Sequence, residues 1–465
     1  AKGVKRDGNG VRRGSTTSLV TVDQDGQRSE GLYMIGQLAT LRAETRTIAE
    51  LHDAVSSEGS RRLTEVRETP VSLSSSRTPR PSNVAIIGMG CIMPKAADLI
   101  RYWENIINKV NAVTEVPETR WDWRRYFEAD TKKQDRFYSK WGGFLDPVPF
   151  DPMRYGMPPN SLKSIEPLQL LTLETVRIAL ADAGYADRPF PRERTSVIVG
   201  ASGGLADLGQ GYAVRAALPT FFDDVPKDVL SQLPEWTEDS FAGTLTNVTA
   251  GRVANRLDLG GVNYSINAAC ASSLAAVYAA VKELEAGTSD MVLVAGADTF
   301  QNPHFFFCFS KTQALSPTGR CRTFDKDADG TCISEGIAVV ALKRLADAER
   351  DGDRIYGVIK GVGGSSDGRH KGLTAPHPEG QARALNRAYA KSGLSPASVG
   401  LIEAHGTGTV AGDRSEIETL KQVFESAHAR HRGCALGSVK STTGHTKSAA
   451  GVAGLIKVAL ALHHK

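Results

Sequence analysis

The chain has 465 residues, of which 41% are hydrophobic, which is enough to bury one large core or two ordinary ones and excludes a disordered protein. Lysine and arginine exceed aspartate and glutamate by only 56 − 52 = 4, and this near balance argues against nucleic acid or a membrane surface as the main partner. The six cysteines form no C-x-x-C pair, so the sequence indicates neither a disulfide framework nor a zinc site and favours a reducing cytoplasm.

Residues 1–55 are predicted to form a small unit of their own. Ser18–Val22 and Ser29–Met34 have strand patterns and flank a hairpin signal at Asp25-Gly26, and Thr47–Val55 has a helical pattern. A unit of this size is too small to be a domain.

A linker is expected over residues 56–83, because Ser, Arg, Pro and Glu dominate there and hydrophobic periodicity disappears. The chain begins at Ala1 rather than at methionine, so we expect it to be a piece of a longer protein. Gly31–Gly36 and Thr47–His52 resemble the tail of a flavin-dependent nitronate-monooxygenase-like barrel, which would make residues 1–55 the end of an upstream oxidoreductase-like domain.

A buried strand begins at Val84 and is predicted to run into a tight glycine turn at Gly88-Met-Gly90. A dinucleotide site is not favoured here. Met93 stands where the third glycine of G-x-G-x-x-G would be, Pro94 follows it, and no acidic residue on a second strand supports ribose binding.

Aromatic residues and prolines are dense between Trp103 and Pro159, which predicts irregular surface structure packed on the core. Leu168–Ala183 is then predicted as a helix and Thr195–Gly200 as a strand. Gly203–Thr237 is a long polar and aromatic excursion, which we interpret as a cap or a subunit contact.

Cys270 lies where a strand pattern, Val262–Ala268, gives way to a helix pattern, Ala271–Ala286, and the strand Met291–Ala297 follows. By the crossover rule the two strands are parallel, so the sheet is at least partly parallel. A thiol at the first turn of a helix faces free backbone N–H groups and the positive end of the helix dipole. We therefore expect the pKa of Cys270 to lie below the ~8.5 of a free cysteine.

A second series of strands and helices follows, and a histidine comes after each of two of its strands. His405 comes directly after the strand Val399–Glu403, and His445 follows Lys440 at the end of the strand Cys434–Val439. Both histidines thus lie past the carboxyl ends of neighbouring parallel strands, where open α/β sheets place ligands. The other predicted elements are the strands Ile337–Leu342 and Ile355–Val362 and the helices Gln381–Ser392, Asp413–Ala427 and Ser448–Leu462, the last too short and too interrupted by Lys457 to span a membrane.

One thiolate with two imidazoles suits covalent acyl chemistry, in which the cysteine accepts an acyl group and the histidines handle a carboxylate or a developing enolate. The residues that carry this chemistry also carry a resemblance. Ala269-Cys-Ala-Ser-Ser273, Glu403-Ala-His-Gly-Thr-Gly-Thr409 with Gly412-Asp413, and Lys440-x-x-x-Gly-His445 resemble the three active-site motifs of β-ketoacyl synthases. Phe324-Asp-x-x-x-Asp-Gly330 and Glu335-Gly336 match a fourth signature of that family.

The resemblance covers residues 84–465 and implies a thiolase fold, an α/β architecture of two pseudo-repeated halves in five αβαβα layers, usually paired as a homodimer. It implies that Cys270 holds the acyl group and that His405 and His445 act on malonyl carried by the phosphopantetheine of an acyl carrier protein, giving a decarboxylative Claisen condensation. Lys440, Asp413, Thr407 and Thr409 would be supporting groups. No cofactor or metal bound by the domain itself is implied.

Among subclasses, the chain resembles the ketosynthase of iterative type I polyketide or polyunsaturated-fatty-acid synthases, through Leu233–Phe241, Leu315–Arg320 and Gly444–Ser448. It departs from the family pattern at Asn267, commonly Asp, and at Ser334, commonly Gly or Arg. It also ends at Lys465, before the family's last strands and the glycine-rich loop expected to complete the oxyanion hole with the N–H of Cys270.

Several alternatives stay open. An initiation-type synthase would pair the cysteine with histidine and asparagine, a thiolase would need a second cysteine near the carboxyl end, and a partner subunit without catalysis would normally lack the nucleophile. A malonyl decarboxylase is the nearest non-elongating alternative. A metal site rests only on His428 with His431 and on His463 with His464, which lack acidic or cysteine partners nearby in the sequence.

Residues 263–267 mix polar and apolar side chains, unlike a strand that is covered on both faces. In the thiolase fold such a strand lies at the subunit boundary and pairs with its symmetry mate, so we expect a dimer in which the Gly203–Thr237 excursion contributes to the partner's acyl tunnel. Acyl chain length, the extender beyond malonyl, the product and the role of residues 1–55 do not follow from the sequence.

Overall fold

We analysed a computed structural model of the chain, which describes residues 4–6, 19–21, 23, 25, 44–68, 80–130, 132–202, 206–369, 372 and 375–464. The chain divides into two compact units, Ala1–Arg77 and Thr78–Lys465, and each is described by itself.

In the first unit, strand β1 (Val4–Arg6) pairs antiparallel with β2 (Leu19–Thr21). The predicted strand Ser18–Val22 is therefore present as β2, whereas Ser29–Met34 lies outside the described residues. The fate of residues 1–55 as the end of an upstream domain stays a prediction.

Helix α2 (Ile48–Glu68) is longer than the predicted helix, which ended at Val55, so the first part of the expected linker is helical. Thr47 and Glu50 form a reciprocal capping box: each side chain accepts a hydrogen bond from the other residue's backbone N–H. Ion pairs at helical spacing, such as Arg61 with Glu65, stabilise the part of the helix after Val55. The apolar spacing of Ile48, Leu51 and Val55 does not continue there, so hydrophobic periodicity could not show that the helix extends to Glu68.

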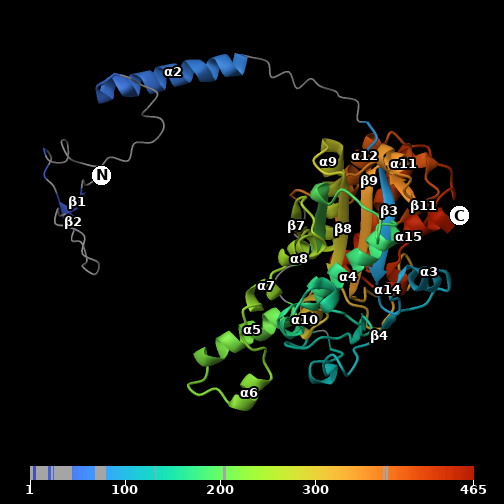
Figure 1. The fold of residues 1–465 in the computed structure, drawn as a ribbon. Coiled ribbons are helices and arrows are strands. Elements are labelled where there is room, and N and C mark those ends of the chain that lie inside the picture. The colour runs from blue at the N-terminus through green and yellow to red at the C-terminus, as the bar shows by residue number, and fades with distance from the viewer. Residues whose placement is uncertain are drawn as a thin grey trace. The chain divides into compact units, whose positions relative to one another are not determined.

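The second unit is built on a six-stranded sheet with the order β10-β3-β9-β8-β6-β7 (Figure 1). Its strands are β3 (Val84–Ile92), β6 (Thr195–Ala201), β7 (Asn263–Ile266), β8 (Met291–Asp298), β9 (Gly336–Arg344) and β10 (Gly357–Ile359). β6 runs parallel to β7 and β8, while β9, β3 and β10 are joined antiparallel. The predicted partly parallel sheet is confirmed, and β7 and β8 run parallel as predicted, although β6 lies between them.

Helices cover both faces of this sheet. Successive residues of a strand point to opposite faces, so Leu293 and Ala295 of β8 pack toward α4 (Pro167–Asp182) and α8 (Val248–Leu257). Val292 and Val294 pack toward α9 (Ser272–Ala286) and α15 (Ala450–His464) (Figure 1). Fully buried apolar side chains on both faces explain the continuous apolar runs of β6 and β8.

The second half contributes a parallel pair, β11 (Leu401–Glu403) and β12 (Ala435–Gly437). Helix α15 contacts both this pair and the six-stranded sheet, so it lies between them. The remaining helices of this half are α12 (Pro378–Ser392), α13 (Val410–Ser426) and α14 (Lys440–Thr443).

The predicted glycine turn after the first strand is wrong, because Gly88 and Gly90 lie inside β3. A Cβ at Gly88 would stand 2.5 Å from the carbonyl oxygen of Ala179 and 2.6 Å from the Cβ of Ala183. The missing side chain therefore lets α4 pack directly onto the strand, a role in packing that a local pattern cannot distinguish from a turn.

The aromatic region between Trp103 and Pro159 contributes to a separate core around the fully buried rings of Phe137 and Phe306, with Trp121 packed edge-on against both.

Within the Gly203–Thr237 excursion, α5 (Asp207–Ala217) and α6 (Lys227–Ser231) extend away from the sheet (Figure 1), and Phe221 and Trp236 are exposed there. The elements of these regions and their surroundings are α3 (Leu99–Ile107), β4 (Val113–Glu115), β5 (Trp141–Gly143), α5 (Asp207–Ala217), α6 (Lys227–Ser231), α7 (Ser240–Thr244), α10 (Pro303–Lys311) and α11 (Leu345–Arg350).

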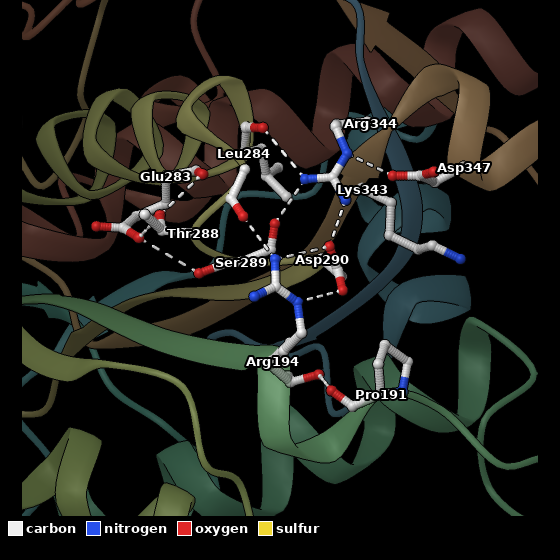
Figure 2. Close-up of polar contacts among 12 residues, drawn as sticks. Pro191, Arg194, Glu283, Leu284, Thr288, Ser289, Asp290, Lys343, Arg344 and Asp347 are labelled. Atoms are coloured by element: carbon white, nitrogen blue, oxygen red, sulfur yellow. Dashed lines mark hydrogen bonds and ion pairs between the residues drawn. The ribbon is translucent and has the colours of Figure 1, made fainter.

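A network of charged side chains fixes the edge of the sheet where β6 and β8 begin (Figure 2). Asp290 accepts hydrogen bonds from Arg194 and Arg344, and Arg344 also donates to the carbonyls of Leu284 and Ser289 at the end of α9. Arg194 and Arg344 thus tie the end of α9 and the residues that follow it to the start of β6 and the end of β9. The candidate site lies at the opposite ends of these strands, where β6, β7 and β8 end.

Candidate active site

Cys270 lies on a short 3-10 turn between β7 and α9. The residue before it, Ala269, has a φ of +50°, a strained conformation for a side chain other than glycine. Side-chain hydrogen bonds hold this turn: Asn267 accepts from the N–H of Ala269, and Ser272 accepts from the N–H of Ala268 and donates to the carbonyl of Ala269. The Asn267 side chain is thus a turn-forming group, which gives this departure from the family pattern a physical role.

His405 follows β11 in a loop whose backbone is held by Glu416. The Glu416 carboxylate accepts the N–H of His405 at 2.7 Å and the N–H of Gly406 at 2.8 Å. Glu416 was not singled out from the sequence. Its position three residues after Asp413 on the same helix was the signal that could have found it, because residues three apart share a helix face.

The supporting residues predicted around this loop form hydrogen bonds with it or within it. Asp413 accepts the N–H of Gly408 at 3.1 Å and the N–H of Phe324 at 2.6 Å, so it ties the loop to the fourth signature. The hydroxyls of Thr407 and Thr409 bond each other at 2.8 Å.

His445 is buried, and its tautomer follows from one contact. Its Nδ1 accepts the backbone N–H of Lys447 at 3.0 Å, so the ring proton of the neutral imidazole is on Nε2. The histidine backbone is also fixed, since its N–H donates to the carbonyl of Cys332 and its carbonyl accepts the N–H of Ser334. His445 therefore presents Nε2–H as a hydrogen-bond donor.

The structure brings the three predicted groups together. Ligand atoms of Cys270, His405 and His445 lie within 4.8 Å of one another, and the two imidazole rings are 5.4 Å apart at 88°. Gly296, near the end of β8, makes this possible. A Cβ there would stand 2.6 Å from the Cβ of Ser273 and 2.9 Å from the Cα of Ala449, so its absence lets the starts of α9 and of the last helix converge.

Burial sets the protonation states of the site. It raises the pKa of Cys270, although the ammonium groups of Lys440 and Lys447 oppose that rise, so the expected depressed pKa is wrong. The sequence showed the helix terminus but not the loss of solvent around it. Burial, with a smaller contribution from Lys440, lowers the pKa of His405 to about 3 even though part of its surface is exposed, and it holds the pKa of His445 well below the usual range. Both histidines are thus neutral near pH 7.

Two buried lysines lie beneath the site. Burial lowers the pKa of Lys440, against the attraction of Glu403, Glu416 and the Cys270 thiolate. Lys447 was not predicted as a site residue: its Nζ pairs with Asp298 at 3.0 Å and donates to the carbonyl of Ser334 at 2.8 Å. A charged residue at the end of the apolar strand β8 was the sequence signal for Asp298.

The trio has the geometry to hold a metal ion, and it is the one such cluster of at least three ligands among the described residues. The histidine pairs His428 with His431 and His463 with His464 do not belong to any cluster of three ligands among the described residues. His464 instead stacks on Trp103 with ring centroids 5.1 Å apart, and His463 lies against Tyr356. All six cysteines are free.

Comparison with known proteins identifies the chain's family. The model of the β-ketoacyl synthase N-terminal domain matches residues 82–348, and that of the C-terminal domain matches residues 356–465. The chain belongs to the β-ketoacyl synthase family. This confirms the resemblance found in the sequence, and with it an acyltransferase-class ketosynthase domain and its mixed α/β thiolase fold.

The relatives are multidomain synthases. The chain is 38% identical to polyketide synthase PksN of Bacillus subtilis over 85% of its own length and 7% of that protein. It is also 38% identical to one chain of the polyunsaturated fatty acid synthase of Thraustochytrium sp., over 83% of its length and 14% of that protein. A solved oxazolomycin ketosynthase domain of Streptomyces albus superposes with a TM-score of 0.71 at 34% identity, covering 82% of this chain and 63% of that one. Among the described residues, no helix is both long and apolar enough to cross a membrane.

Proposed function

We propose that this ketosynthase elongates an acyl chain by decarboxylative Claisen condensation, with the acyl group on Cys270 and malonyl supplied by an acyl carrier protein. The observation that carries the proposal is the convergence of Cys270, which follows β7, with two neutral imidazoles from the loops beyond β11 and β12. A nucleophile and two hydrogen-bond donors are what thioester exchange and enolate stabilisation require.

In the loading step, the Cys270 thiolate attacks the carbonyl carbon of an acyl thioester carried on phosphopantetheine. The new C–S bond forms as the bond to the pantetheine sulfur breaks. The proton that the Cys270 thiol gave up goes to that sulfur, which leaves as a thiol. Lys440 and Lys447 favour the thiolate electrostatically. The backbone N–H of Cys270 is expected to contribute to the oxyanion hole.

In the extension step, malonyl thioester loses CO2, and the electron pair of the broken C–C bond moves into an enolate. The Nε2–H of His445 is set to donate to the enolate oxygen, because its Nδ1 is already occupied by the N–H of Lys447. His405, which is also neutral, supplies the second polar contact. The enolate carbon then attacks the acyl carbonyl on Cys270, the thiolate leaves, and the β-ketoacyl chain is two carbons longer.

The proposal is tested by intact-mass measurement after incubation with an acyl thioester donor. Wild-type chain should gain one acyl group, and Cys270→Ala should gain none. Cys308→Ala, which removes an exposed thiol that belongs to none of the motifs, is the control and should be acylated like wild type. An acyl adduct that persists in Cys270→Ala would overturn the assignment.

The partners follow from the same proposal. A carrier protein and the other domains of a multidomain synthase would supply the substrates, and a reducing cytoplasm would keep the free thiols reduced. No observation favours a malonyl decarboxylase or a non-catalytic subunit, since the nucleophile is present and set on a held turn. The domain itself would bind no further cofactor.

We also propose a homodimer formed along β7. This strand is the last in its sheet, and Val262, Leu274 and Tyr278 beside it are 49%, 51% and 41% exposed. An open sheet edge next to apolar side chains is a surface that a second copy can cover. Light scattering on the chain should report a dimer, and a stable, active monomer would contradict this pairing.

A further inference from the structure

The residue two positions after His445 has a backbone conformation that residues with a side chain avoid. Lys447 begins a short 3-10 turn with a φ of +47°. For a residue with a Cβ, this left-handed region is disfavoured by roughly five- to thirtyfold in population. Contacts outside the local backbone must therefore hold Lys447 in this conformation.

The side chain of Lys447 makes such contacts at its far end. Its Nζ lies 3.0 Å from Asp298, 2.8 Å from the carbonyl of Ser334 and 3.4 Å from the amide oxygen of Gln301. Lys447 is 4% exposed, and Asp298 and Ser334 are fully buried. An ammonium that left these acceptors would lose its hydrogen bonds without regaining water. The side chain is thus anchored.

The backbone of Lys447 in turn fixes the ring of His445. Its N–H donates to Nδ1 of His445 at 3.0 Å. The His445 backbone is held by the segment that also receives the lysine side chain, since its N–H donates to the carbonyl of Cys332 and its carbonyl accepts the N–H of Ser334. The ring, the backbone on either side of it and the Lys447 side chain therefore form one closed set of hydrogen bonds.

An anchored lysine fixes this turn in a way that glycine would not. Glycine adopts positive φ without cost but does not stay there, because it populates positive and negative φ about equally. If the N–H of residue 447 turned away, Nδ1 of His445 would lose its donor and the ring proton could move to Nδ1. Nε2 would then present a lone pair to an enolate oxygen and repel it.

We propose that Lys447 is a positioning residue for His445. Its buried side chain holds residue 447 in the left-handed conformation, and the backbone N–H held in this way keeps the ring proton of His445 on Nε2. Asp298, at the end of β8, is the anchor for that side chain. The inference rests on the proposed extension step, in which the Nε2–H donates to the enolate oxygen.

The test compares Lys447→Gly with Lys447→Ala, both in the full chain carrying Asp298→Asn. This background leaves no buried carboxylate without its counter-ion. The two variants lose the same side-chain contacts and differ by one methyl group, which disfavours the left-handed backbone only in the alanine variant. Acyl loading on Cys270, measured by intact mass, should be equal in the two because they lack the same charges.

Malonyl decarboxylation should separate the two variants. Lys447→Ala should release CO2 roughly five- to thirtyfold more slowly than Lys447→Gly at saturating malonyl thioester, which is the cost of left-handed backbone for a residue with a Cβ. Equal rates would overturn the proposal. If both were near the wild-type rate, packing alone would hold the backbone, and if both were equally slow, the charge of Lys447 would matter rather than its anchoring.

A second measurement identifies the tautomer without catalysis. In the chain with isotope-labelled histidine, long-range proton–nitrogen correlation NMR distinguishes Nε2–H from Nδ1–H imidazole, and His445→Ala identifies the His445 signals. Wild type and Lys447→Gly should show mainly Nε2–H, and Lys447→Ala should show a large share of Nδ1–H. An unchanged tautomer in Lys447→Ala would refute the positioning role. If wild type neither loads nor decarboxylates but the tautomers behave as described, the proposed function fails and the positioning role stands.

A second pair of variants serves if Lys447→Ala does not fold. Asparagine enters the left-handed region several-fold more readily than most residues with a side chain. In the Asp298→Asn background, Lys447→Asn should therefore behave like the glycine variant, whereas Lys447→Gln should lose decarboxylation and the Nε2–H tautomer. The same rate and tautomer in both would contradict the proposal.

Discussion

Replacing Lys447 with methionine should destabilise the domain far more than the loss of an ion pair at the surface. Lys447 and Asp298 are 4% and 0% exposed, and their charged atoms are 3.0 Å apart. Lys447→Met would leave the Asp298 carboxylate buried without its counter-ion. Breaking a buried pair in this way costs about 3–5 kcal/mol, because the remaining charge keeps its desolvation penalty.

A matched control exists on α9. Lys282 pairs with Glu285 at 2.9 Å, almost the same distance, but the Lys282 side chain is about half exposed. An exposed pair contributes about 0–1 kcal/mol, so Lys282→Met should change the free energy of unfolding by no more than that. The two variants remove the same charge and differ mainly in burial.

Urea unfolding followed by circular dichroism measures both variants, and the double variant Lys447→Met with Asp298→Asn completes the test. It should recover a large part of the loss, since neither charge is then left alone. If Lys447→Met unfolds within about 1 kcal/mol of Lys282→Met, the pair does not carry the stability assigned to it here. No recovery in the double variant would likewise show that the loss comes from packing rather than from charge.

Three further predictions concern the site. Because burial raises the pKa of Cys270, its alkylation by iodoacetamide, followed by intact mass, should still accelerate above about pH 8.5, the pKa of a free cysteine, and a plateau below that pH would contradict the raised value. His445→Ala should keep acyl loading and lose about 100-fold or more in malonyl decarboxylation, measured as CO2 release, whereas a collapse of loading alone would make His445 the base for the thiol. Glu416→Gln replaces one of two accepting oxygens with an amide donor, so one N–H of His405 or Gly406 loses its partner; unfolding free energy should fall by about 1–3 kcal/mol in urea titration, and a wild-type value would refute the bridging role.

The sequence predicted the chemistry of the site better than its environment. Cys270 follows β7 of the six-stranded sheet, and His405 and His445 come after the strands of the separate β11–β12 pair. Each follows the carboxyl end of a strand, and strand polarity is a local property that residue patterns report. The pKa of Cys270 depends instead on how much protein surrounds the thiol, which is set by helices distant in sequence. Glu416 and Asp298 were missed for a similar reason, because their partners come from other elements.

The fold was predictable where apolar periodicity decides it. The helix Leu168–Ala183 and the strand Thr195–Gly200 were placed within one residue at each end, since buried faces dictate both patterns. Helix α2 shows the limit, because the part after Val55 is stabilised by ion pairs and the apolar spacing of its first turns does not continue there. Gly88 shows another limit, because the sequence does not distinguish a glycine that lets a helix pack closely on a strand from a glycine that makes a turn.

The two faces of the six-stranded sheet bear on how such a domain can diversify. The reacting groups are organised with α9 and α15 on one face, while α4 and α8 cover the other. Substitutions in the layer of α4 and α8 can therefore accumulate without moving the atoms that react. Asp298 links the two faces, because it accepts the N–H of Phe300 and pairs with Lys447.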